Sequence, residues 1–460
     1  MGSFTFTNLT RAVEIGANSY ALDLAGKRIV LDSGMHPKHD GNDALPNMGL
    51  VADGSVDAII LSHAHHDHLG SLPLLQRRQP QAPVFTTEAT RQLADVMLHN
   101  SVNVMERRRD EGVTGYPLFT HGEVNACLKR WRPAPLRTRF DLTGERLGSD
   151  DAPISVEFFD AGHILGSVGT LIRAHGRTIF YTGDVQFDDQ TVMQAARFPE
   201  EPVDVLIMET TRGDYETPAG FTRAAEERRL ADAIARAFAN GGGVLIPTFA
   251  LGKTQEMLAL FHEFRTRRWI NGDCPIYIGG LGAKLTEIHD KLAGQTPRRD
   301  SKLRLLDATS PFVMAGEGAG LAPMKAHRIY ALSSGMMTEH TLSNTFARNV
   351  LSAPPHALLF IGYADPESPA GKIRAAAPGD IVQLSPDLAP QPLTCHVDRF
   401  TFSAHASRET LRAYANRVRP KKIILVHGDA PAIEWFRSAL AGDLPDSEIV
   451  TPEPGVQIEI

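Results

Sequence analysis

The sequence has few cysteines and no long apolar run. Only Cys127, Cys274 and Cys395 occur among 460 residues, and none belongs to a CxxC pair. Three separated thiols exclude a disulfide framework and a thiolate zinc site, so we expect buried, reduced cysteines in a cytoplasmic protein. No stretch of about 18 uninterrupted apolar residues occurs, and the N-terminus lacks the basic-then-apolar shape of a secretory signal. We therefore expect no association with a membrane.

Positive charge is also in deficit. The 47 Lys and Arg residues are outnumbered by 54 Asp and Glu residues, which gives a net charge of -7. This net charge argues against general binding of polyanions. The sum does not include the charge of bound cations, however, and it does not reveal a local positive groove. Basic clusters at 107–109, 265–268 and 421–422 are typical of solvated helix faces or loops, and we assign none of them to a ligand.

One short segment concentrates candidate metal ligands. The run IILSHAHHDHLG at 59–70 carries four of them within six positions, namely His63, His65, Asp67 and His68. So many imidazoles and a carboxylate at the end of a buried strand are costly unless a divalent cation binds them. The spacing predicts a two-metal site on a loop between a strand at 56–61 and a helix from Gly70 onward. Any one histidine alone would fit an ordinary core or surface residue, and His66 receives at most a supporting role.

This segment resembles the metallo-β-lactamase superfamily. The residues that would complete the superfamily's site follow in order, each after an apolar run: Asp32 in IVLDSGM, His163 in FFDAGHILG and Asp184 in IFYTGDVQ. The resemblance implies that Asp32 orients a ligating histidine and that Asp184 bridges both metals. A bridging carboxylate is physically reasonable, because two dications about 4 Å apart repel each other and a shared anion offsets the repulsion.

Other segments resemble the β-CASP nuclease branch of that superfamily. The stretch 32–46, DSGMHPKHDGNDALP, is similar to the endonuclease subunit of the cleavage and polyadenylation machinery and its prokaryotic relatives. Glu209 in DVLIMETTRGD, His405 in TFSAHAS and His427 in ILVHGD match further marks of the branch. In RNA-cleaving members the position of His427 is a histidine ligand, whereas DNA-repair relatives carry an aliphatic residue there.

The resemblance predicts an α/β fold with an inserted domain. We expect an αββα metallo-β-lactamase sandwich at 1–209 and 386–460, with a doubly wound α/β β-CASP cap at 210–385. Helical spacing at 222–240, glycines at 241–243 and a strand at 244–247 agree with the start of the cap. The Pro-rich stretch 386–392 reads as a loop near the return to the first domain.

The resemblance also implies a mechanism that uses two Zn²⁺, with Mn²⁺ as the alternative for ligands rich in nitrogen and oxygen. His63, His65 and His163 would bind one metal, and Asp67, His68 and His427 the other. Asp184 and a bridging hydroxide would be shared, and the hydroxide would attack the phosphorus atom.

The leaving 3′ oxygen needs a proton donor. His405 is the predicted general acid, kept protonated by Glu209, because an adjacent carboxylate raises the pKa of an imidazole. Asp67 would accept the proton of the attacking hydroxide. Without the resemblance, Glu209 would be better explained as a helix-capping or surface carboxylate.

One segment resembles the loop of the family's cap domain that lies close to the RNA backbone. It comprises Ser333, Ser334 and Gly335, and hydroxyls beside a glycine allow close contact with a phosphate. The family's usual Gly-Gly is replaced by Glu339 and His340, and the effect of this change is open because a carboxylate there would repel a phosphate. Lys253 is interpreted as structural.

The leading prediction is a zinc-dependent hydrolase that acts in RNA processing as an endonuclease on single-stranded RNA. A 5′ exonuclease activity is a possible addition. A single strand would enter the cleft expected between sandwich and cap, whereas a duplex would have to open. The alternatives are a DNA nuclease, a small-ester hydrolase, or a non-catalytic scaffold subunit that binds little zinc. The natural transcript, the protein partners and the oligomeric state, including a homodimer, stay open.

Overall fold

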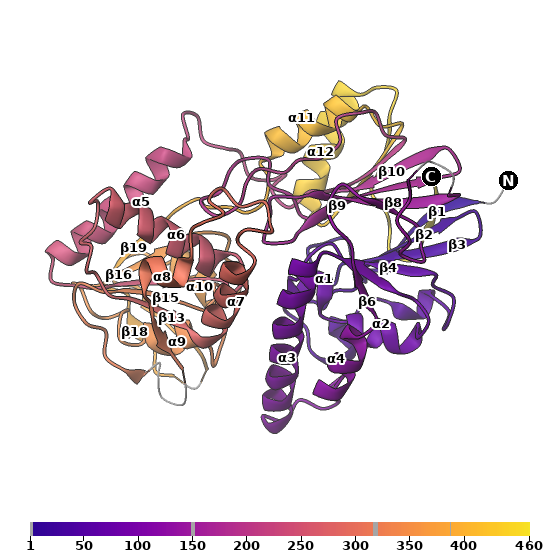
Figure 1. Cartoon of the computed structure of the whole chain (residues 1–460). Coiled ribbons are helices and arrows are strands. Elements are labelled where there is room, and N and C mark those ends of the chain that lie inside the picture. Colours follow the sequence, from indigo (N-terminus) through magenta and orange to yellow (C-terminus); the bar gives the residue numbers. More distant parts are fainter. Residues whose placement is uncertain (1–2, 149–151, 316–320, 387) are drawn as a thin grey trace. The chain divides into compact units, whose positions relative to one another are not determined.

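The computed structural model describes residues 3–148, 152–315, 321–386 and 388–460, which divide into two compact units. The first unit comprises 1–189, 193–217 and 405–460, and the second comprises 190–192 and 218–404. The chain leaves the first unit and returns to it, so the second unit is an insertion (Figure 1). The predicted α/β sandwich with an inserted α/β domain is confirmed.

The return to the first unit comes later than the predicted boundary at 386. Strand β19 (His396–Arg399) pairs in parallel with β16 (Ala357–Phe360) at the edge of the second unit's sheet, so the insertion extends to residue 404. The insertion also begins at 218, where 210 was predicted. Polar edge strands such as β19 lack the apolar pattern from which strands are predicted.

The first unit is a sandwich of two sheets. One sheet has the strand order β22-β1-β2-β3-β4-β5-β6, and the other has the order β21-β20-β11-β10-β9-β8-β7. In chain order the strands of the first sheet are β1 (Phe4–Asn8), β2 (Tyr20–Leu24), β3 (Lys27–Leu31), β4 (Ala58–Ile60), β5 (Val84–Thr86), β6 (Trp131–Pro133) and β22 (Gln457–Glu459). Those of the second are β7 (Arg139–Phe140), β8 (Ile154–Asp160), β9 (Val168–Ala174), β10 (Arg177–Tyr181), β11 (Val205–Glu209), β20 (Lys422–Val426) and β21 (Glu448–Val450).

Both faces of the second sheet are buried, which explains its nearly continuous apolar strands. Val205 and Ile207 of β11 point into the core between the two sheets. Their neighbours Leu206 and Met208 pack with helices α11 (Arg408–Val418) and α12 (Ala430–Asp443), which cover the other face (Figure 1). The remaining helices of this unit are α1 (His66–Leu69), α2 (Leu72–Arg78), α3 (Glu88–Asp110) and α4 (His121–Leu128), with the short 3-10 helices η1 (Gly41–Ala44) and η2 (Met48–Leu50).

The second unit has a parallel sheet with the order β14-β13-β15-β12-β16-β19. Its other strands are β12 (Val244–Pro247), β13 (Ile276–Gly279), β14 (Phe312–Met314), β15 (Ile329–Leu332) and a separate pair, β17 (Ile381–Val382) with β18 (Gln391–Pro392). Its helices are α5 (Arg223–Ala239), α6 (Lys253–Thr266), α7 (Gly280–Lys291), α8 (Leu305–Thr309), α9 (Leu342–Ala347) and α10 (Pro369–Ala375). The predicted helix at 222–240 and strand at 244–247 are confirmed as α5, with Thr222 as N-cap, and β12.

Two predictions about composition can be checked directly. All three cysteines are free and buried, as expected. Among the helices of the described residues, none is both long and apolar enough to cross a bilayer.

Candidate metal centre

The predicted ligands follow the carboxyl ends of strands that run in the same direction. β3 and β4 are parallel in the first sheet, and β10, β11 and β20 are parallel in the second. β8 also runs in the direction of β10, because both are antiparallel to β9. The loops after these strands meet at one edge of the sandwich, and a single edge therefore receives the polar residues of six separate segments.

The segment after β4 supplies four candidate ligands through a sharp change of backbone direction. His63 lies in the loop, His65 is the N-cap residue of α1, and Asp67 and His68 belong to this four-residue helix. The sequence predicted a loop up to Gly70, so the helix begins four residues earlier than expected. A Cβ atom on Gly34 would lie 1.6 Å from the carbonyl oxygen of Asp67, so only glycine allows the preceding loop to pack against α1.

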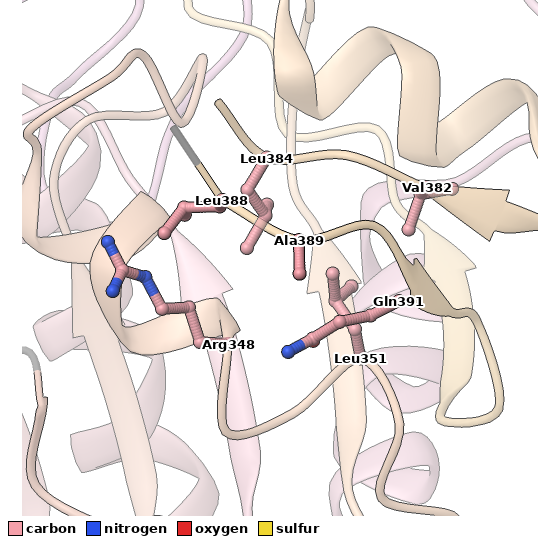
Figure 2. Close-up of a pocket in the computed structure, with 7 residues that line it drawn as sticks. All are labelled: Arg348, Leu351, Val382, Leu384, Leu388, Ala389 and Gln391. Atoms are coloured by element: carbon pink, nitrogen blue, oxygen red, sulfur yellow. The ribbon is translucent and has the colours of Figure 1, made fainter. Parts of the chain in front are cut away.

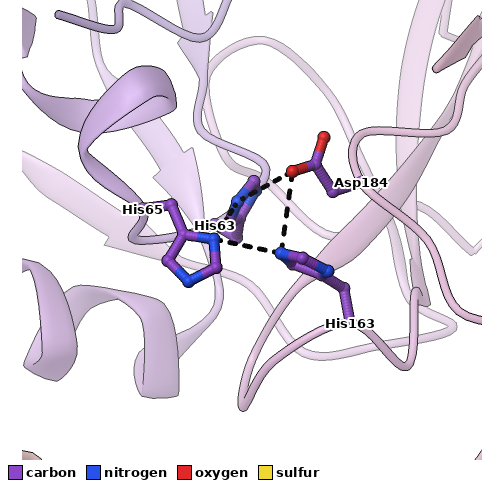
Figure 3. A group of neighbouring side chains, drawn as sticks. All are labelled: His63, His65, His163 and Asp184. Carbon is purple, nitrogen blue, oxygen red and sulfur yellow. Dashed lines mark hydrogen bonds and ion pairs between the residues drawn. The ribbon is translucent and has the colours of Figure 1, made fainter. Parts of the chain in front are cut away.

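A first group of ligand atoms comes from three histidines and one aspartate. His65 Nδ1 lies 3.2 Å from His63 Nε2 and 3.0 Å from His163 Nε2 (Figure 3). Asp184 Oδ2 lies 3.5 Å from His63 Nε2 and 3.6 Å from His163 Nε2. Three ring nitrogens and a carboxylate oxygen therefore converge on one point, which is the donor set of a tetrahedral zinc site.

A second group lies on the other side of the Asp184 carboxylate. Asp67 Oδ2 lies 3.3 Å from His427 Nε2 and 3.8 Å from His68 Nε2. Asp184 Oδ1 lies 3.3 Å from His68 Nε2. Asp184 thus directs one oxygen toward each group, which is the arrangement that a bridging carboxylate requires.

Asp184 also shows how well the residues fit a cation. Its Oδ1 atom is buried and accepts no hydrogen bond within the part of the chain that the structure describes. A buried carboxylate oxygen without a donor is costly unless a positive charge lies beside it. The nitrogen and oxygen donors of both groups fit Zn²⁺ or Mn²⁺.

The electrostatics of the histidines agree with ligand roles. Burial and the nearby His68 lower the pKa of His63 well below its usual range, and burial lowers that of His65, so both rings offer a lone pair. Burial alone would lower the pKa of His68, but the carboxylates of Asp184, Asp67 and Asp32 together raise it well above its usual range. The carboxylates therefore demand positive charge at this point, which an imidazolium or a metal cation can supply.

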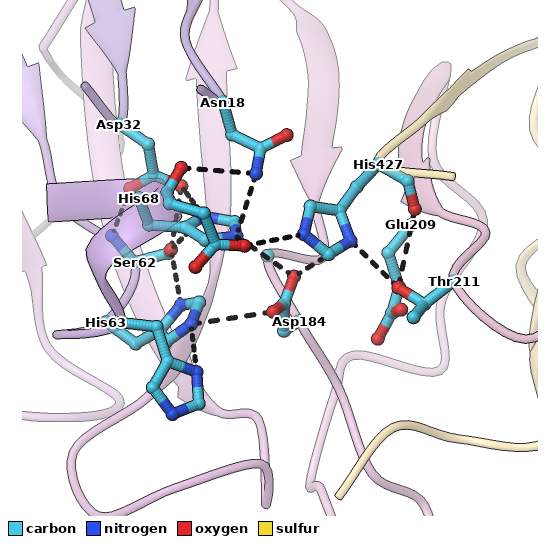
Figure 4. Close-up of polar contacts among 12 residues, drawn as sticks. Asn18, Asp32, Ser62, His63, His68, Asp184, Glu209, Thr211 and His427 are labelled. Atoms are coloured by element: carbon cyan, nitrogen blue, oxygen red, sulfur yellow. Dashed lines mark hydrogen bonds and ion pairs between the residues drawn. The ribbon is translucent and has the colours of Figure 1, made fainter. Parts of the chain in front are cut away.

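A hydrogen-bond network behind the site fixes two of the rings (Figure 4). Asp32 Oδ2 accepts from His68 Nδ1 at 2.8 Å, from the Tyr181 hydroxyl at 2.7 Å and from the Ser62 hydroxyl at 2.7 Å. Because the Ser62 proton goes to Asp32, Ser62 Oγ accepts from His63 Nδ1 at 3.0 Å. Both histidines therefore keep their proton on Nδ1 and direct a free Nε2 into the site. Asp32 itself is fully buried and has a φ of 58°, a strained conformation for a residue other than glycine.

The second group contains a similar support. His427, which follows β20 with a φ of 52°, lies with Nδ1 2.8 Å from Thr211 Oγ1. The Thr211 hydroxyl donates to the His427 carbonyl oxygen at 3.3 Å, so its oxygen accepts from Nδ1. Thr211 thereby holds the tautomer whose Nε2 faces Asp67.

A histidine–carboxylate pair lies beside the first group. Glu209 ends β11 and is 1% exposed, which excludes the alternative of a surface or helix-capping carboxylate. Its Oε2 lies 3.0 Å from His405 Nδ1, and its Oε1 accepts from the Val185 amide at 2.7 Å. The centroid of the His405 ring is 4.6 Å from that of His163. The pair is thus positioned to transfer a proton next to the ligand groups.

The other predicted residues lie elsewhere. His66, in α1, has its Nδ1 atom 3.4 Å from Ser101 Oγ and belongs to neither ligand group. Ser333, Ser334 and Gly335 follow β15 in the second unit.

Sequence reasoning missed the supporting residues Ser62, Tyr181 and Thr211, and also Asn18, whose Nδ2 atom is 3.3 Å from His68 Nε2. Ser62 is adjacent to His63 and Thr211 lies two residues after Glu209, and this closeness in sequence was a usable signal. No signal pointed to Asn18 or Tyr181.

A small pocket of about 70 Å³ in the second unit offers no competing site (Figure 2). Its walls are mainly apolar, and it is well below the 300 to 1,000 Å³ of ordinary ligand pockets. The lining residues are Arg348, Leu351, Val382, Leu384, Leu388, Ala389 and Gln391.

Comparison with protein-family models places three domains along the chain. A beta-lactamase superfamily domain matches residues 27–238, and a Beta-Casp domain matches 254–373. A Zn-dependent metallo-hydrolase RNA specificity domain matches 390–452. The three models together cover both units.

Curated relatives match along nearly the whole chain. Endoribonuclease YSH1 of Eremothecium gossypii is 28% identical over 95% of this chain and 56% of its own length. Cleavage and polyadenylation specificity factor 73 of Drosophila melanogaster is 28% identical over 93% of this chain and 60% of its own length. Cleavage and polyadenylation specificity factor subunit 3-I of Arabidopsis thaliana is 26% identical over 99% of this chain and 63% of its own length. The chain therefore spans less than two thirds of the length of these relatives.

A solved structure supports the fold alone. The crystal structure of a protein of unknown function from Enterococcus faecalis aligns over 100% of both chains with a TM-score of 0.57 and 15% sequence identity.

Proposed function

Because the chain belongs to the β-CASP branch of the metallo-β-lactamase superfamily, we propose that it is a metal-dependent ribonuclease that cleaves single-stranded RNA internally. The names of the relatives support this, since several are endoribonucleases and several others are cleavage and polyadenylation specificity factors or their subunits. The match to an RNA specificity domain supports RNA as the substrate class. Trimming from a 5′ end is a second activity that the same site could perform.

Two ligand groups would hold two divalent cations, most simply Zn²⁺. One group consists of His63, His65 and His163, and the other of Asp67, His68 and His427, with Asp184 shared. When bound there, the cations would acidify a water molecule and stabilise negative charge on a phosphoryl group. The buried Asp184 carboxylate favours this occupancy, because its Oδ1 atom accepts no hydrogen bond within the described residues and a nearby cation would compensate its charge.

The observation that carries the proposal is the His405–Glu209 pair beside these ligand groups. Glu209 accepts from His405 Nδ1, so the proton available for transfer would be the one on Nε2. The His405 side chain is 23% exposed, whereas Glu209 is buried, so only the histidine can be reached. His405 would donate its Nε2 proton to the leaving 3′ oxygen, and Glu209 would stabilise the ring throughout the transfer.

Asp67 is suited to the opposite proton transfer. Its carboxylate is 22% exposed, more than the Asp184 carboxylate at 2%, and Oδ1 is the oxygen not directed at His427. Asp67 would accept the proton that the attacking water loses. A donor and an acceptor of protons beside the same ligand groups suit cleavage of a phosphodiester bond.

The test uses purified protein and compares RNA with DNA, and linear RNA with circular RNA. We expect cleavage of labelled single-stranded RNA, much slower cleavage of DNA with the same sequence, and about two metal ions per chain by elemental analysis. Circular RNA has no ends, so its cleavage would establish internal cutting, and resistance would favour the 5′ exonuclease. Faster turnover of DNA or a carboxylic ester would refute the proposal, and a chain that retains little metal and cleaves nothing would be a scaffold subunit.

A further inference from the structure

Two aromatic side chains are exposed just beyond neighbouring strands of the second unit. Phe249 follows β12 and is 38% exposed, and Tyr363 follows β16 and is 60% exposed. β12 lies between β15 and β16, and all three run in parallel. Loops at the carboxyl edge of such a sheet are where ligands usually bind, so exposed aromatic rings at this edge are candidates for a binding surface.

The Phe249 ring is held in place by the loop after β15. A Cβ atom on Gly335 would lie 2.9 Å from both Cδ2 and Cε2 of Phe249, so the glycine allows the ring to rest against the loop backbone. One part of the ring is therefore packed, while the rest stays accessible. A ring fixed in this way loses little conformational entropy when another planar group stacks on it.

The same loop carries one serine hydroxyl without a partner. Ser334 Oγ accepts from the Thr338 amide at 3.1 Å and lies 3.0 Å from Thr338 Oγ1, so it stabilises the loop itself. Within the described ranges the Ser333 hydroxyl makes no hydrogen bond, and the Ser333 side chain is half-buried. Of the two serines, Ser333 is therefore the one available to a ligand.

We propose that Phe249 and Tyr363 stack on bases of the single-stranded RNA substrate, with the Ser333 hydroxyl directed at its sugar-phosphate backbone. The inference rests on the proposed ribonuclease function and adds how the substrate is held. β12 and β16 are paired parallel strands about 4.8 Å apart, so the loops that carry the two rings begin side by side. Stacking tolerates any sequence, and it needs no excess of positive charge, which this chain of net charge -7 lacks.

The test measures RNA binding without cleavage. Fluorescence anisotropy with a labelled single-stranded RNA is recorded for metal-loaded protein that carries His405→Ala, alone and with Phe249→Ala or Tyr363→Ala. Each aromatic substitution should weaken binding about fivefold or more, from the usual strength of base–aromatic stacking. Phe249→Leu keeps an apolar side chain over Gly335 and removes only the aromatic face, so it should weaken binding even if the alanine variant folds poorly.

Two controls separate stacking from other contacts. Phe312 is 57% exposed but begins β14, at the opposite edge of the parallel sheet, and Phe312→Ala should leave binding unchanged. An abasic version of the RNA should bind all variants equally, because it has no bases to stack. Equal losses on intact and abasic RNA, or no loss at all, would overturn the inference, and the latter would point to a protein-binding surface.

Failure of the inference and failure of the proposed function give different results. If the unsubstituted protein binds and cleaves RNA while Phe249→Leu and Tyr363→Ala behave like it, only the stacking surface is refuted. If the unsubstituted protein hydrolyses bis(p-nitrophenyl) phosphate but neither binds nor cleaves RNA, the ribonuclease assignment itself is refuted.

Discussion

Replacing Thr211 by valine should weaken metal binding at one of the two ligand groups. Valine has nearly the shape of threonine but no hydroxyl, so the change removes the acceptor 2.8 Å from His427 Nδ1 and the weaker bond that the hydroxyl donates to the His427 carbonyl oxygen at 3.3 Å. Without that acceptor the imidazole is free to carry its proton on Nε2, the atom that faces Asp67 at 3.3 Å. A protonated Nε2 cannot bind a metal.

The expected magnitude follows from the kind of bond that is lost. Removing a group that supports a metal-bound histidine usually costs 10- to 100-fold in metal affinity. A hydrogen bond between neutral groups contributes about 0.5–1.5 kcal/mol, so we expect a loss near tenfold, equivalent to about 1.4 kcal/mol. The loss should affect one metal per chain, because Thr211 supports His427, which belongs to the second ligand group.

Competition with a chelator, followed by zinc content per chain, measures this loss. Thr210→Val is the matched control, since the Thr210 hydroxyl donates to the Val426 carbonyl oxygen at 3.0 Å and contacts no ligand atom. It should lower the free energy of unfolding by about 1 kcal/mol and leave metal affinity unchanged. Thr211→Ser should restore binding. Wild-type affinity for both metals in Thr211→Val, or equal losses in both valine variants, would refute the role given to the hydroxyl.

Three further predictions concern the ligand groups and their surroundings. Asp184→Ala should abolish metal loading and cleavage, whereas His405→Ala should keep both metals and slow cleavage by about 10²- to 10⁴-fold; elemental analysis showing equal metal loss would contradict the general acid. Gly34→Ala places a Cβ 1.6 Å from a backbone carbonyl oxygen of α1 and should lower both Tm and zinc content, whereas Gly272→Ala, with nothing within 4 Å, should change neither. Burial raises the pKa of Asp160 to about 7, so its contribution to stability is present below about pH 4, where the unfolded carboxyl is also protonated, and is lost as the pH rises through about 7. In Asp160→Asn the free energy of unfolding should fall less between these pH values, and an unchanged pH profile would contradict the shift.

The candidate ligands could be predicted because they are concentrated in sequence. Four of them share the segment 63–68, and the others each follow an apolar run that becomes a strand. Alternation and apolar runs identify strand ends, and strand ends of parallel strands meet at one edge. The structure brings these side chains together, and their roles as ligands remain predictions.

The supporting hydroxyls could not be predicted in the same way. Tyr181 belongs to β10 and Asp32 follows β3, so their 2.7 Å hydrogen bond depends on how two sheets face each other. Threonine and serine are common residues with no required spacing in sequence. Their function here depends on which acceptor the hydroxyl proton is donated to, because this decides whether the oxygen can accept from a histidine Nδ1. The late return at residue 405 was missed for a related reason, since β19 contains three polar residues and only one valine.

The insertion of the second unit has a consequence for the order in which the protein is made on the ribosome. His405 and His427 are translated only after the whole insertion, although their partners Glu209, Asp67 and Asp184 precede it. A nascent chain that ends before residue 405 holds the first group of ligands together with Asp67 and His68, but it lacks the proton donor His405 and the last ligand of the second group, His427. On the proposed function, such a chain could not yet cleave RNA, because the proton donor and His427 are still to be made.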